Sequence, residues 1–301
     1  MALATLQKPL CRRLALVGVG LIGGSLTLAL KQAGAVGEVI GWDRDAVNLQ
    51  LAVELGVVDR AAVSLATAVA DADLVVLALP VQALAPVAAE LLPHLAPGTV
   101  LTDTGSVKES VVTAIEPLAL RFGCHFVGGH PISGTERSGA VAAFASLYQG
   151  KRCILTPTSA TDGAAVALVT ALWQAAGSAV VQMDVRKHDR ILAAISHLPH
   201  MIAYALVNAV SAYDQYPENI LEYTAGGFHD FTRIASSDPV MWRDIALENR
   251  AAVLEMIAQF ERFLAELKGD IERADGAALQ AFFRQSKISR DAIVQSAVRG
   301  E

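Results

Sequence analysis

Short apolar runs alternate with helix-like segments through the first half of the chain. The apolar runs are brief and are bounded by turn residues, which is typical of strands buried on both faces of a sheet. They are Leu14–Val17, Glu38–Trp42, Leu74–Leu79 and Val100–Thr102. The segments between them have helical length and are rich in Ala and Leu; they are Ser25–Ala33, Ala46–Leu55 and Val81–Leu92. Strands that alternate with helices predict an α/β fold with a parallel sheet and right-handed crossovers.

The second half of the chain has a different pattern. Three more candidate strands come first, and we expect several of them to extend the sheet: His125–Val127, Arg152–Thr156 and Ala179–Gln182. Strand-like runs then end near Asp184, and long helical segments take over: Lys187–Tyr213, Pro239–Lys268 and Gly276–Val298. A chain of 301 residues is longer than one core usually serves. We therefore predict two domains, residues 1–184 with the sheet and residues 185–301 entirely helical.

A glycine-rich turn follows the first predicted strand and opens the first helix. Its sequence is Gly18-Val19-Gly20-Leu21-Ile22-Gly23. The first glycine permits the tight turn, the second lets the backbone approach a pyrophosphate, and the third allows close packing of helix on strand. In this context the motif predicts a Rossmann-type doubly wound sheet and a dinucleotide site formed by Gly18, Gly20, Leu21, Ile22 and Gly23.

The end of the second predicted strand bears on which dinucleotide binds. Asp43 lies 20 residues beyond Gly23, where a carboxylate can bind the ribose 2′-hydroxyl of NAD and would repel a 2′-phosphate. Arg44 follows immediately and could receive the 2′-phosphate of NADP if it swung inward. We expect NAD as the cofactor, with NADP as the alternative.

Composition and charge exclude several classes of protein. Hydrophobic residues make up 53% of the chain and charged residues 18%, which is too apolar for a disordered protein. The net charge is −6 and the chain has no run rich in Lys and Arg, so we expect neither nucleic acid nor an anionic membrane as a partner. Cys11, Cys124 and Cys153 are interpreted as reduced thiols of a cytoplasmic protein, and the opening segment lacks the order of a secretory signal.

One segment, Ile191–Val210, is apolar enough to suggest a membrane span. It carries His197, Pro199 and His200 near its middle, and these residues are costly in lipid. A helix buried in the core of an oligomer is the better interpretation. The two histidines lie three residues apart, but the chain has no HExxH motif and no carboxylate partner for them, so we expect no metal site.

Polar residues follow two later strands. The segment Asp103-Thr104-Gly105-Ser106-Val107-Lys108 comes after the strand at Val100–Thr102, and His130 comes after another strand between Gly-Gly and Pro. The carboxyl ends of strands are where open α/β sheets bind ligands. We expect His130 to lie on a rigid turn beside the dinucleotide site, where a histidine is a candidate general base.

Five segments together carry a resemblance to a known family. GVGLIGGS, DTGSVK, GGHPISGTE, SHLPH and GFHDFTRIASSDPVMWRDI occur here in the order typical of the prephenate/arogenate dehydrogenases of tyrosine biosynthesis. The resemblance covers about residues 12 to 300, and no motif residue is missing. It implies an NAD(P)-dependent oxidoreductase whose helical half forms an intertwined homodimer.

The resemblance also implies roles for individual residues. His130 matches the catalytic histidine that hydrogen-bonds the substrate ring hydroxyl, and Ser106 resembles the serine that assists it on the nicotinamide side. Arg233 matches the arginine that binds a substrate carboxylate. Other residues resemble those of the substrate pocket: Ser196, His197, His200, Thr135 and Glu136.

The chemistry of such a substrate agrees with these residue types. Prephenate is a dianion with a ring carbinol, so its site needs a base, a hydride acceptor and fixed cations. An arginine suits bidentate carboxylate binding, and Arg233 lies between apolar neighbours. The alternative for Arg233 is a salt bridge between domains, with Glu136 or Asp230 as its partner.

Other functions remain open at this point. The substrate could be prephenate, arogenate or both, as in a cyclohexadienyl dehydrogenase, because the two differ only in a keto or amino side chain. A β-hydroxyacid dehydrogenase would share both halves of the fold but typically uses a lysine as its acid/base. A non-catalytic nucleotide sensor would have little reason to combine Ser106, His130 and Arg233 with an intact glycine loop. We expect a monofunctional enzyme, since no segment is left over for a mutase or regulatory domain.

Overall fold

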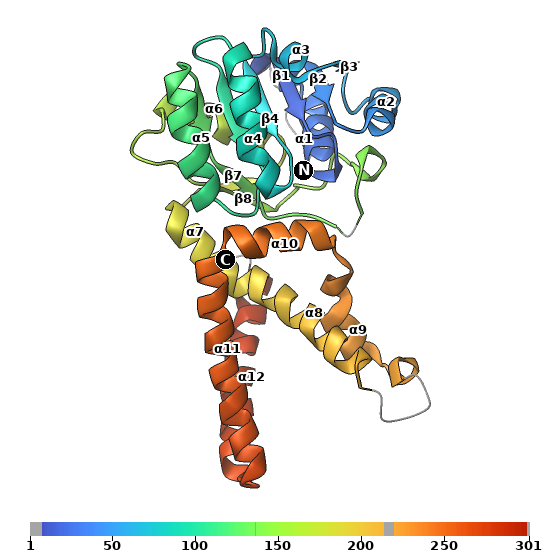
Figure 1. Cartoon of the computed structure of the whole chain (residues 1–301), viewed down its shortest axis with the longest axis vertical. Coiled ribbons are helices and arrows are strands. Elements are labelled where there is room, and N and C mark those ends of the chain that lie inside the picture. Colours follow the sequence, from blue (N-terminus) through green and yellow to red (C-terminus); the bar gives the residue numbers. More distant parts are fainter. Residues whose placement is uncertain (1–7, 136, 214–219, 300–301) are drawn as a thin grey trace. The chain divides into compact units, whose positions relative to one another are not determined.

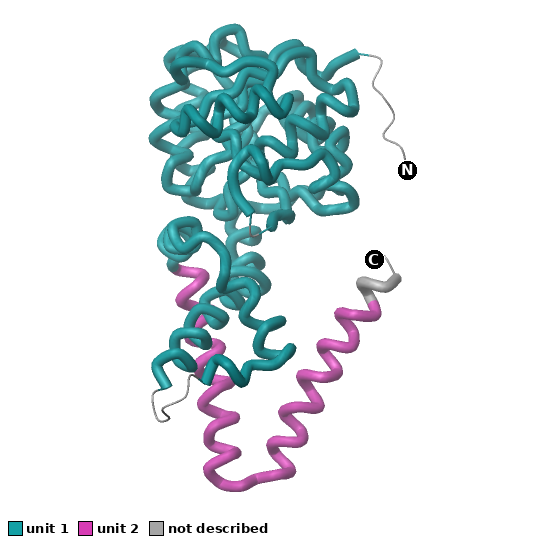
Figure 2. Tube along the Cα trace, turned by 90° about the vertical axis from the view of Figure 1, so that its right-hand side faces the viewer, with its two compact units in different colours: residues 1–250 teal, residues 251–301 magenta. Residues whose placement is uncertain are grey.

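The computed structural model describes residues 8–135, 137–213 and 220–299 of the chain. The chain divides into two compact units, residues 1–250 and residues 251–301, which Figure 2 shows in different colours.

A six-stranded sheet forms the centre of the first unit. Its order is β3-β2-β1-β4-β5-β6, and every neighbouring pair is parallel. The strands are β1 (Cys11–Val17), β2 (Val36–Trp42), β3 (Arg60–Ala61), β4 (Leu74–Leu77), β5 (Val100–Asp103) and β6 (His125–Val127). Strand order reverses between β1 and β4, as in a doubly wound Rossmann-type sheet, so the predicted fold class is confirmed.

Helices cover both faces of this sheet (Figure 1). They are α1 (Leu21–Gln32), α2 (Ala46–Glu54), α3 (Leu65–Val69), α4 (Val81–Leu91), η1 (Leu92–His94), α5 (Glu109–Arg121), η2 (Ala140–Ala142) and α6 (Gly163–Ala175). Successive side chains of a strand point to opposite faces. Leu14 and Leu16 of β1 therefore join a core with α1 and α6, whereas Ala15 and Val17 join a second core with α4 and α5.

A second, three-stranded sheet corrects part of the expectation from the sequence. We expected several late strands to extend the main sheet, and only β6 does so. The others form the order β7-β8-β9, from β7 (Gly129–Pro131), β8 (Arg152–Leu155) and β9 (Ala179–Gln182). His130 thus lies in a short strand paired antiparallel with β8, opposite Ile154, and not on a turn. Gly128 separates β6 from β7 and allows the chain to leave one sheet for the other.

Helices alone follow β9 in the part of the chain that the structure describes. Within the first unit they are α7 (Val185–Leu192), η3 (Ala193–His197), α8 (Leu198–Ser211), η4 (Ile220–Tyr223), α9 (Gly226–Thr232), η5 (Arg233–Ser236) and α10 (Pro239–Glu248). The element η3 is a π-helical turn, which lets the helical run pass the SHLPH segment without a break. The run Val185–Ser211 is long and apolar enough to cross a membrane by length and composition, and 28% of its most apolar window is buried.

The long helix expected over Pro239–Lys268 is interrupted. Asn249 ends α10, and α11 (Arg250–Glu272) begins at the next residue. The side chain of Asn249 is buried, and its amide donates to the carbonyl oxygen of Asp189 at 2.8 Å. This contact joins residues 60 positions apart, so no local pattern marks the break.

The second unit consists of α11 and α12 (Gly276–Arg299), two helices joined by a short turn (Figure 2). Ala274 in that turn has a φ of 52°. Phe263 and Phe282 meet edge to face with ring centroids 6.3 Å apart. The compact units divide at residue 250, whereas strands end at Gln182. The domain boundary near Asp184 therefore stays a prediction.

Candidate active site

The glycine loop lies at the carboxyl edge of the main sheet. Val17, Trp42, Leu77 and Asp103 occupy one row across β1, β2, β4 and β5. The loop begins at Gly18, whose φ of +91° favours glycine, and a Cβ there would lie 2.3 Å from the carbonyl oxygen of Ala78. The sheet edge and the loop thus form the crevice in which doubly wound folds bind ligands.

The other two glycines of the loop have different surroundings. A Cβ on Gly23 would lie 2.6 Å from the carbonyl oxygen of Gly18, so this glycine is needed for close packing. A Cβ on Gly20 would meet nothing within 4 Å. Gly20 is also the N-cap of α1 and provides no side-chain cap. The first turn of α1, which includes Leu21 and Ile22, therefore presents amides beside open space, and that arrangement fits a pyrophosphate.

The carboxylate of Asp43 holds the loop from the end of β2. It accepts hydrogen bonds from the amide of Val19 at 2.8 Å and from the amide of Asp45 at 2.9 Å. Asn48 donates to the carbonyl oxygen of Val19 at 2.8 Å and so fixes the same turn. Asp43 is only partly buried, and Arg44 beside it is exposed. A carboxylate at this place can still accept from the hydroxyls of a ribose.

A buried ion pair in the polar segment after β5 also binds the backbone of the segment that follows β6. The side chains of Lys108 and Asp103 are both 0% exposed and form a hydrogen-bonded ion pair. Asp103 also accepts from the amides of Gly105 at 2.8 Å and Gly129 at 3.0 Å, and Lys108 donates to the carbonyl oxygen of Gly129 at 2.8 Å. Each bonded glycine precedes a candidate residue, since Ser106 follows Gly105 and His130 follows Gly129. The ion pair therefore fixes the backbone on which both candidates lie.

His130 is almost entirely buried, with 8% of its surface exposed. Its Nδ1 lies 2.9 Å from Nε2 of His188 on α7. Burial first, and then the nearby His188 and the charge of Lys108, keep the pKa of His130 well below its usual value. The ring is therefore neutral near pH 7, as a proton acceptor must be.

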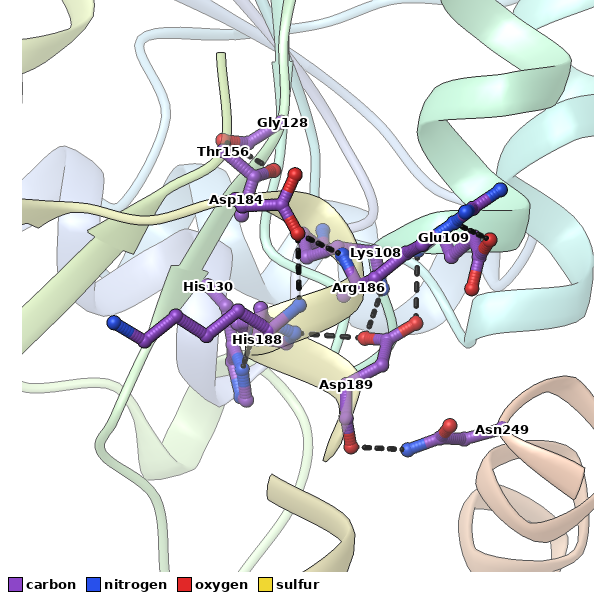
Figure 3. Close-up of polar contacts among 12 residues, drawn as sticks. Lys108, Glu109, Gly128, His130, Thr156, Asp184, Arg186, His188, Asp189 and Asn249 are labelled. Atoms are coloured by element: carbon purple, nitrogen blue, oxygen red, sulfur yellow. Dashed lines mark hydrogen bonds and ion pairs between the residues drawn. The ribbon is translucent and has the colours of Figure 1, made fainter. Parts of the chain in front are cut away.

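His188 is linked in turn to the carboxylate of its neighbour Asp189, which caps the start of α5. Its Nδ1 lies 2.7 Å from Oδ1 of Asp189. Asp189 accepts from the backbone amides of Lys108 at 2.8 Å and Glu109 at 2.9 Å, two of the amides that α5 leaves without helical partners. Figure 3 shows these side chains in one continuous group that also includes Asn249.

The two histidines of the SHLPH segment differ in burial. His197 is 1% exposed, and its Nδ1 accepts from the amide of Asn249 at 3.1 Å. His200 is half-buried, stacks on Trp242 with ring centroids 3.7 Å apart, and donates from Nδ1 to the carbonyl oxygen of Ser196 at 2.8 Å. Nε2 of His200 is thereby left as an acceptor, whereas His197 faces the interior.

Arg233 begins η5 and is exposed. Burial lowers the pKa of His200, and the positive charge of Arg233 lowers it further, whereas the hydrogen bond to Ser196 raises it. Thr135 is exposed, and its hydroxyl accepts from the amide of Arg137 at 3.2 Å. Glu136 lies outside the described residues. The structure thus packs η5, which Arg233 begins, against α8, the helix that carries His200.

Sequence reasoning missed several residues of this site. Asp103 and Lys108 lie in the predicted polar segment after β5, and the signal for Asp103 is a charged residue at the end of an otherwise buried strand. His188 and Asp189 carried a weaker signal, an ionisable pair in a helix directly after the last strand. Asn249 has no signal in the sequence, because it lies inside an apparently continuous helical pattern. Within the described residues no group of three or more His, Cys, Asp or Glu side chains is arranged to hold a metal ion.

Comparison with known proteins agrees with this arrangement. Residues 26–182 match the family model of the prephenate dehydrogenase nucleotide-binding domain, and residues 184–285 match that of the prephenate dehydrogenase dimerization domain. The chain is 37% identical over 284 residues to cyclohexadienyl dehydrogenase of Zymomonas mobilis, and the matched region covers 94% of this chain and 96% of that protein. It is 36% identical over 281 residues to prephenate dehydrogenase of Bacillus subtilis, and the matched region covers 92% of this chain and 75% of that protein.

A solved structure has the same fold over nearly the whole chain. Prephenate dehydrogenase from Aquifex aeolicus, in complex with hydroxyphenyl propionate and NAD+, is similar with a TM-score of 0.88 and 38% identity, over 94% of this chain and 98% of that one. Identity at this level over both halves confirms the resemblance seen in the motifs. The chain belongs to the prephenate dehydrogenase family.

Proposed function

We propose that the protein catalyses the oxidative decarboxylation of prephenate to 4-hydroxyphenylpyruvate, with hydride transfer to NAD. The observation that carries this proposal is His130, a neutral and nearly buried imidazole held at the carboxyl edge of a sheet whose glycine loop fits a dinucleotide. The cyclohexadienyl and prephenate dehydrogenase relatives support the same reaction class.

The glycine loop and Asp43 would hold the cofactor. Gly20 lies beside open space at the start of α1, where the first amides of the helix suit the pyrophosphate, while Asp43 suits the ribose hydroxyls and disfavours a 2′-phosphate. The Aquifex aeolicus relative holds NAD+. When bound, NAD supplies the hydride acceptor. NADP is the alternative, with the exposed Arg44 as the residue that would receive its phosphate.

His130 would accept the proton of the ring hydroxyl as hydride leaves the same carbon. The dienone formed in this way has its carbonyl in conjugation with the carbon that bears the carboxylate. Carbon dioxide is then lost and the ring becomes aromatic, which makes the reaction effectively irreversible. Ser106 would assist His130 at the hydroxyl, since the Asp103–Lys108 pair holds the backbone beside both residues.

Arg233 would bind a carboxylate of the substrate. Arg233 begins η5, which packs against α8, and the hydrogen bond from Nδ1 of His200 to Ser196 leaves Nε2 of that ring as an acceptor for the substrate. Ser196, His197, Thr135 and Glu136 are proposed for the same pocket from the family resemblance. Of these, His197 is the least accessible, because it is buried against Asn249.

A second candidate function is supported by the relative from Zymomonas mobilis, a cyclohexadienyl dehydrogenase. Arogenate differs from prephenate only in an amino group where prephenate has a keto group. An enzyme that accepts arogenate, alone or with prephenate, would use the same base and the same cofactor loop. The side chain of the substrate, and not its ring, would then decide specificity.

We also propose that the protein works as a homodimer in the cytoplasm, with residues 1–184 as the dinucleotide-binding domain and residues 185–301 as the helical one. The matched dimerization-domain family supports this. So does the exposure of α8, in which only Leu198 and Ala203 are buried. Asp189 and His188 in the preceding helix have buried polar partners, which argues against a membrane span there. No nucleic acid or membrane partner is proposed.

One assay tests the proposed reaction and its alternatives. The absorbance of the reduced cofactor is followed with prephenate, arogenate and a 3-hydroxyacid, each with NAD and with NADP. We expect turnover with prephenate and a higher kcat/KM with NAD than with NADP. Turnover with the 3-hydroxyacid alone, or with none of the three, would contradict the proposal.

A further inference from the structure

Three side chains form a continuous hydrogen-bonded row behind the proposed base. His130 contacts His188 at 2.9 Å between Nδ1 and Nε2, and His188 contacts Asp189 at 2.7 Å between Nδ1 and Oδ1 (Figure 3). His188 is 0% exposed and Asp189 is 4% exposed. The row is therefore shielded from water, and the position of each proton in it follows from its neighbours.

The direction of the hydrogen bonds is set at the carboxylate. Asp189 accepts from the backbone amides of Lys108 and Glu109. A carboxylate held by two amides can only accept from a third partner, so Nδ1 of His188 carries a hydrogen and donates it. In a neutral imidazole the other nitrogen is then an acceptor. Nε2 of His188 therefore accepts from Nδ1–H of His130, and Nε2 of His130 keeps its lone pair.

We propose that His188 and Asp189 are positioning residues for the base: they hold His130 in the tautomer with a free Nε2 and receive the proton that it takes up. This inference rests on the proposed function. The hydroxyl proton of the substrate binds to Nε2 of His130. The hydrogen on Nδ1 of His130 then passes to Nε2 of His188. The result is a neutral His130 and a His188 imidazolium beside the carboxylate of Asp189.

The charges around the row favour this final position of the proton. The ammonium of Lys108 lies near both rings and opposes a positive charge on each. Only His188 has a carboxylate in direct contact, and that hydrogen bond favours its protonated form. A positive charge is thus more stable on His188 than on His130, for which the described residues provide no carboxylate partner.

The tautomers can be measured without any reaction. We would label the full-length protein with ¹⁵N-histidine and record two-bond ¹H–¹⁵N spectra near pH 7. His130→Asn and His188→Gln would assign two of the signals, and His94→Gln, at an exposed position of η1, would serve as the control. We expect both His130 and His188 to be neutral with the hydrogen on Nδ1. A His130 signal with the hydrogen on Nε2 would overturn the proposal.

Two substitutions at His188 separate positioning from mere packing. In His188→Gln the amide oxygen can take the place of ring Nε2 and accept from His130, but the side chain cannot be protonated. In His188→Leu the acceptor is lost. We expect kcat to fall by about 10²-fold in His188→Leu, which loses both the acceptor and the site for the proton, within the range for general-base catalysis. In His188→Gln, which keeps the acceptor but cannot take up the proton, we expect a smaller fall of about 10-fold. The affinity for NAD should change by less than about twofold in both.

The outcomes distinguish this inference from the function it rests on. Equal losses of kcat in the two variants, together with lower NAD affinity and melting temperature, would indicate a structural role and overturn it. Parent-like kcat in His188→Leu would also overturn it. If His188→Leu does not fold, the spectra of the parent and of His188→Gln still decide the tautomer. A parent protein that oxidises neither prephenate nor arogenate would refute the proposed function, while the tautomers would still be measurable.

Discussion

The proposed chemistry depends first on His130, whose substitution by Asn keeps a polar side chain but removes the base. We expect His130→Asn to lower kcat by on the order of 10²–10⁴-fold, the usual contribution of general acid–base catalysis. NAD affinity should persist, because the glycine loop is held by Asp43 and Asn48 and not by His130. Steady-state kinetics and a titration with NAD check both statements.

His94→Gln is the matched control for that experiment. His94 is an exposed histidine of η1, and its replacement should leave kcat and KM unchanged. Turnover of His130→Asn near that of the parent enzyme would remove His130 from the role of base.

At Arg233 the expected effect is on substrate binding. A lost charged hydrogen bond to a carboxylate costs about 1.5–3 kcal/mol, so Arg233→Ala should raise KM by roughly 10- to 100-fold with a smaller change in kcat. Arg233→Lys should recover only part, because an ammonium lacks the planar two-pronged donor geometry. Arg60→Ala, at an exposed arginine of β3 that pairs with Glu38, is the control. A parent-like KM for Arg233→Ala would exclude the carboxylate contact.

Among the elements, the junction of β5, β7 and α5 depends on one buried ion pair. Lys108→Met would leave the carboxylate of Asp103 buried without its cation, with only two amides as partners. Breaking a buried pair in this way typically costs about 3–5 kcal/mol. We therefore expect the free energy of unfolding, measured with urea, to fall by about that amount.

Lys31→Met is the matched control for Lys108→Met. Lys31 pairs with Asp59 at 2.6 Å near the surface, with 28% and 37% of the two side chains exposed. Exposed pairs contribute about 1 kcal/mol or less. Equal losses of stability in Lys108→Met and Lys31→Met would show that the buried pair stabilises the fold no more than the pair near the surface.

For the whole molecule, buried neutral histidines predict a loss of stability in acid. Burial lowers the pKa of His197 to about 4 from 6.5. Between those values the unfolded chain binds a proton that the folded chain does not, so the free energy of unfolding falls as the pH falls from 6.5 to 4. His197 alone should contribute a loss of about 2 kcal/mol between pH 7 and pH 5. His130 and His188, whose pKa values burial also lowers, add to it.

Urea unfolding of the parent and of His197→Asn at both pH values tests this. Asn can accept from Asn249 in place of ring Nδ1 but does not titrate. The variant should therefore lose less stability than the parent between pH 7 and pH 5. An identical loss in both proteins would contradict the assignment to His197.

The helical part of the molecule predicts a dimer. Most residues of α8 are only half-buried, and α11 and α12 carry exposed apolar side chains that include Leu264, Phe283 and Ile288. Exposed apolar surface on this scale is typical of an interface. Light scattering after gel filtration at micromolar concentration should give twice the chain mass of 31.6 kDa. A mass equal to one chain would contradict the dimer.

Local sequence patterns were sufficient for the strands of the main sheet and for the cofactor loop. A strand buried on both faces must be apolar at every position, and this leaves a visible run such as Leu74–Leu77. The glycine loop is recognisable for a similar reason, because a positive φ at Gly18 and tight packing at Gly23 exclude other residues. His130 could be named because it follows a predicted strand, whereas the role of Ser106, in the polar segment after β5, was implied only by the family resemblance.

The partners of those residues could be found only in the tertiary structure. Asp189 caps α5 across 81 positions of sequence, and His188 reaches His130 across 58. Asn249 ends α10 through contacts with Asp189 and His197, although its neighbours continue a helical pattern. Hydrophobic periodicity records which face of an element is buried, but not which distant element covers it. The tautomer of the proposed base depends on such distant contacts, so the sequence by itself predicted His130 as the candidate base, and only the folded chain shows the contacts on which its proposed tautomer depends.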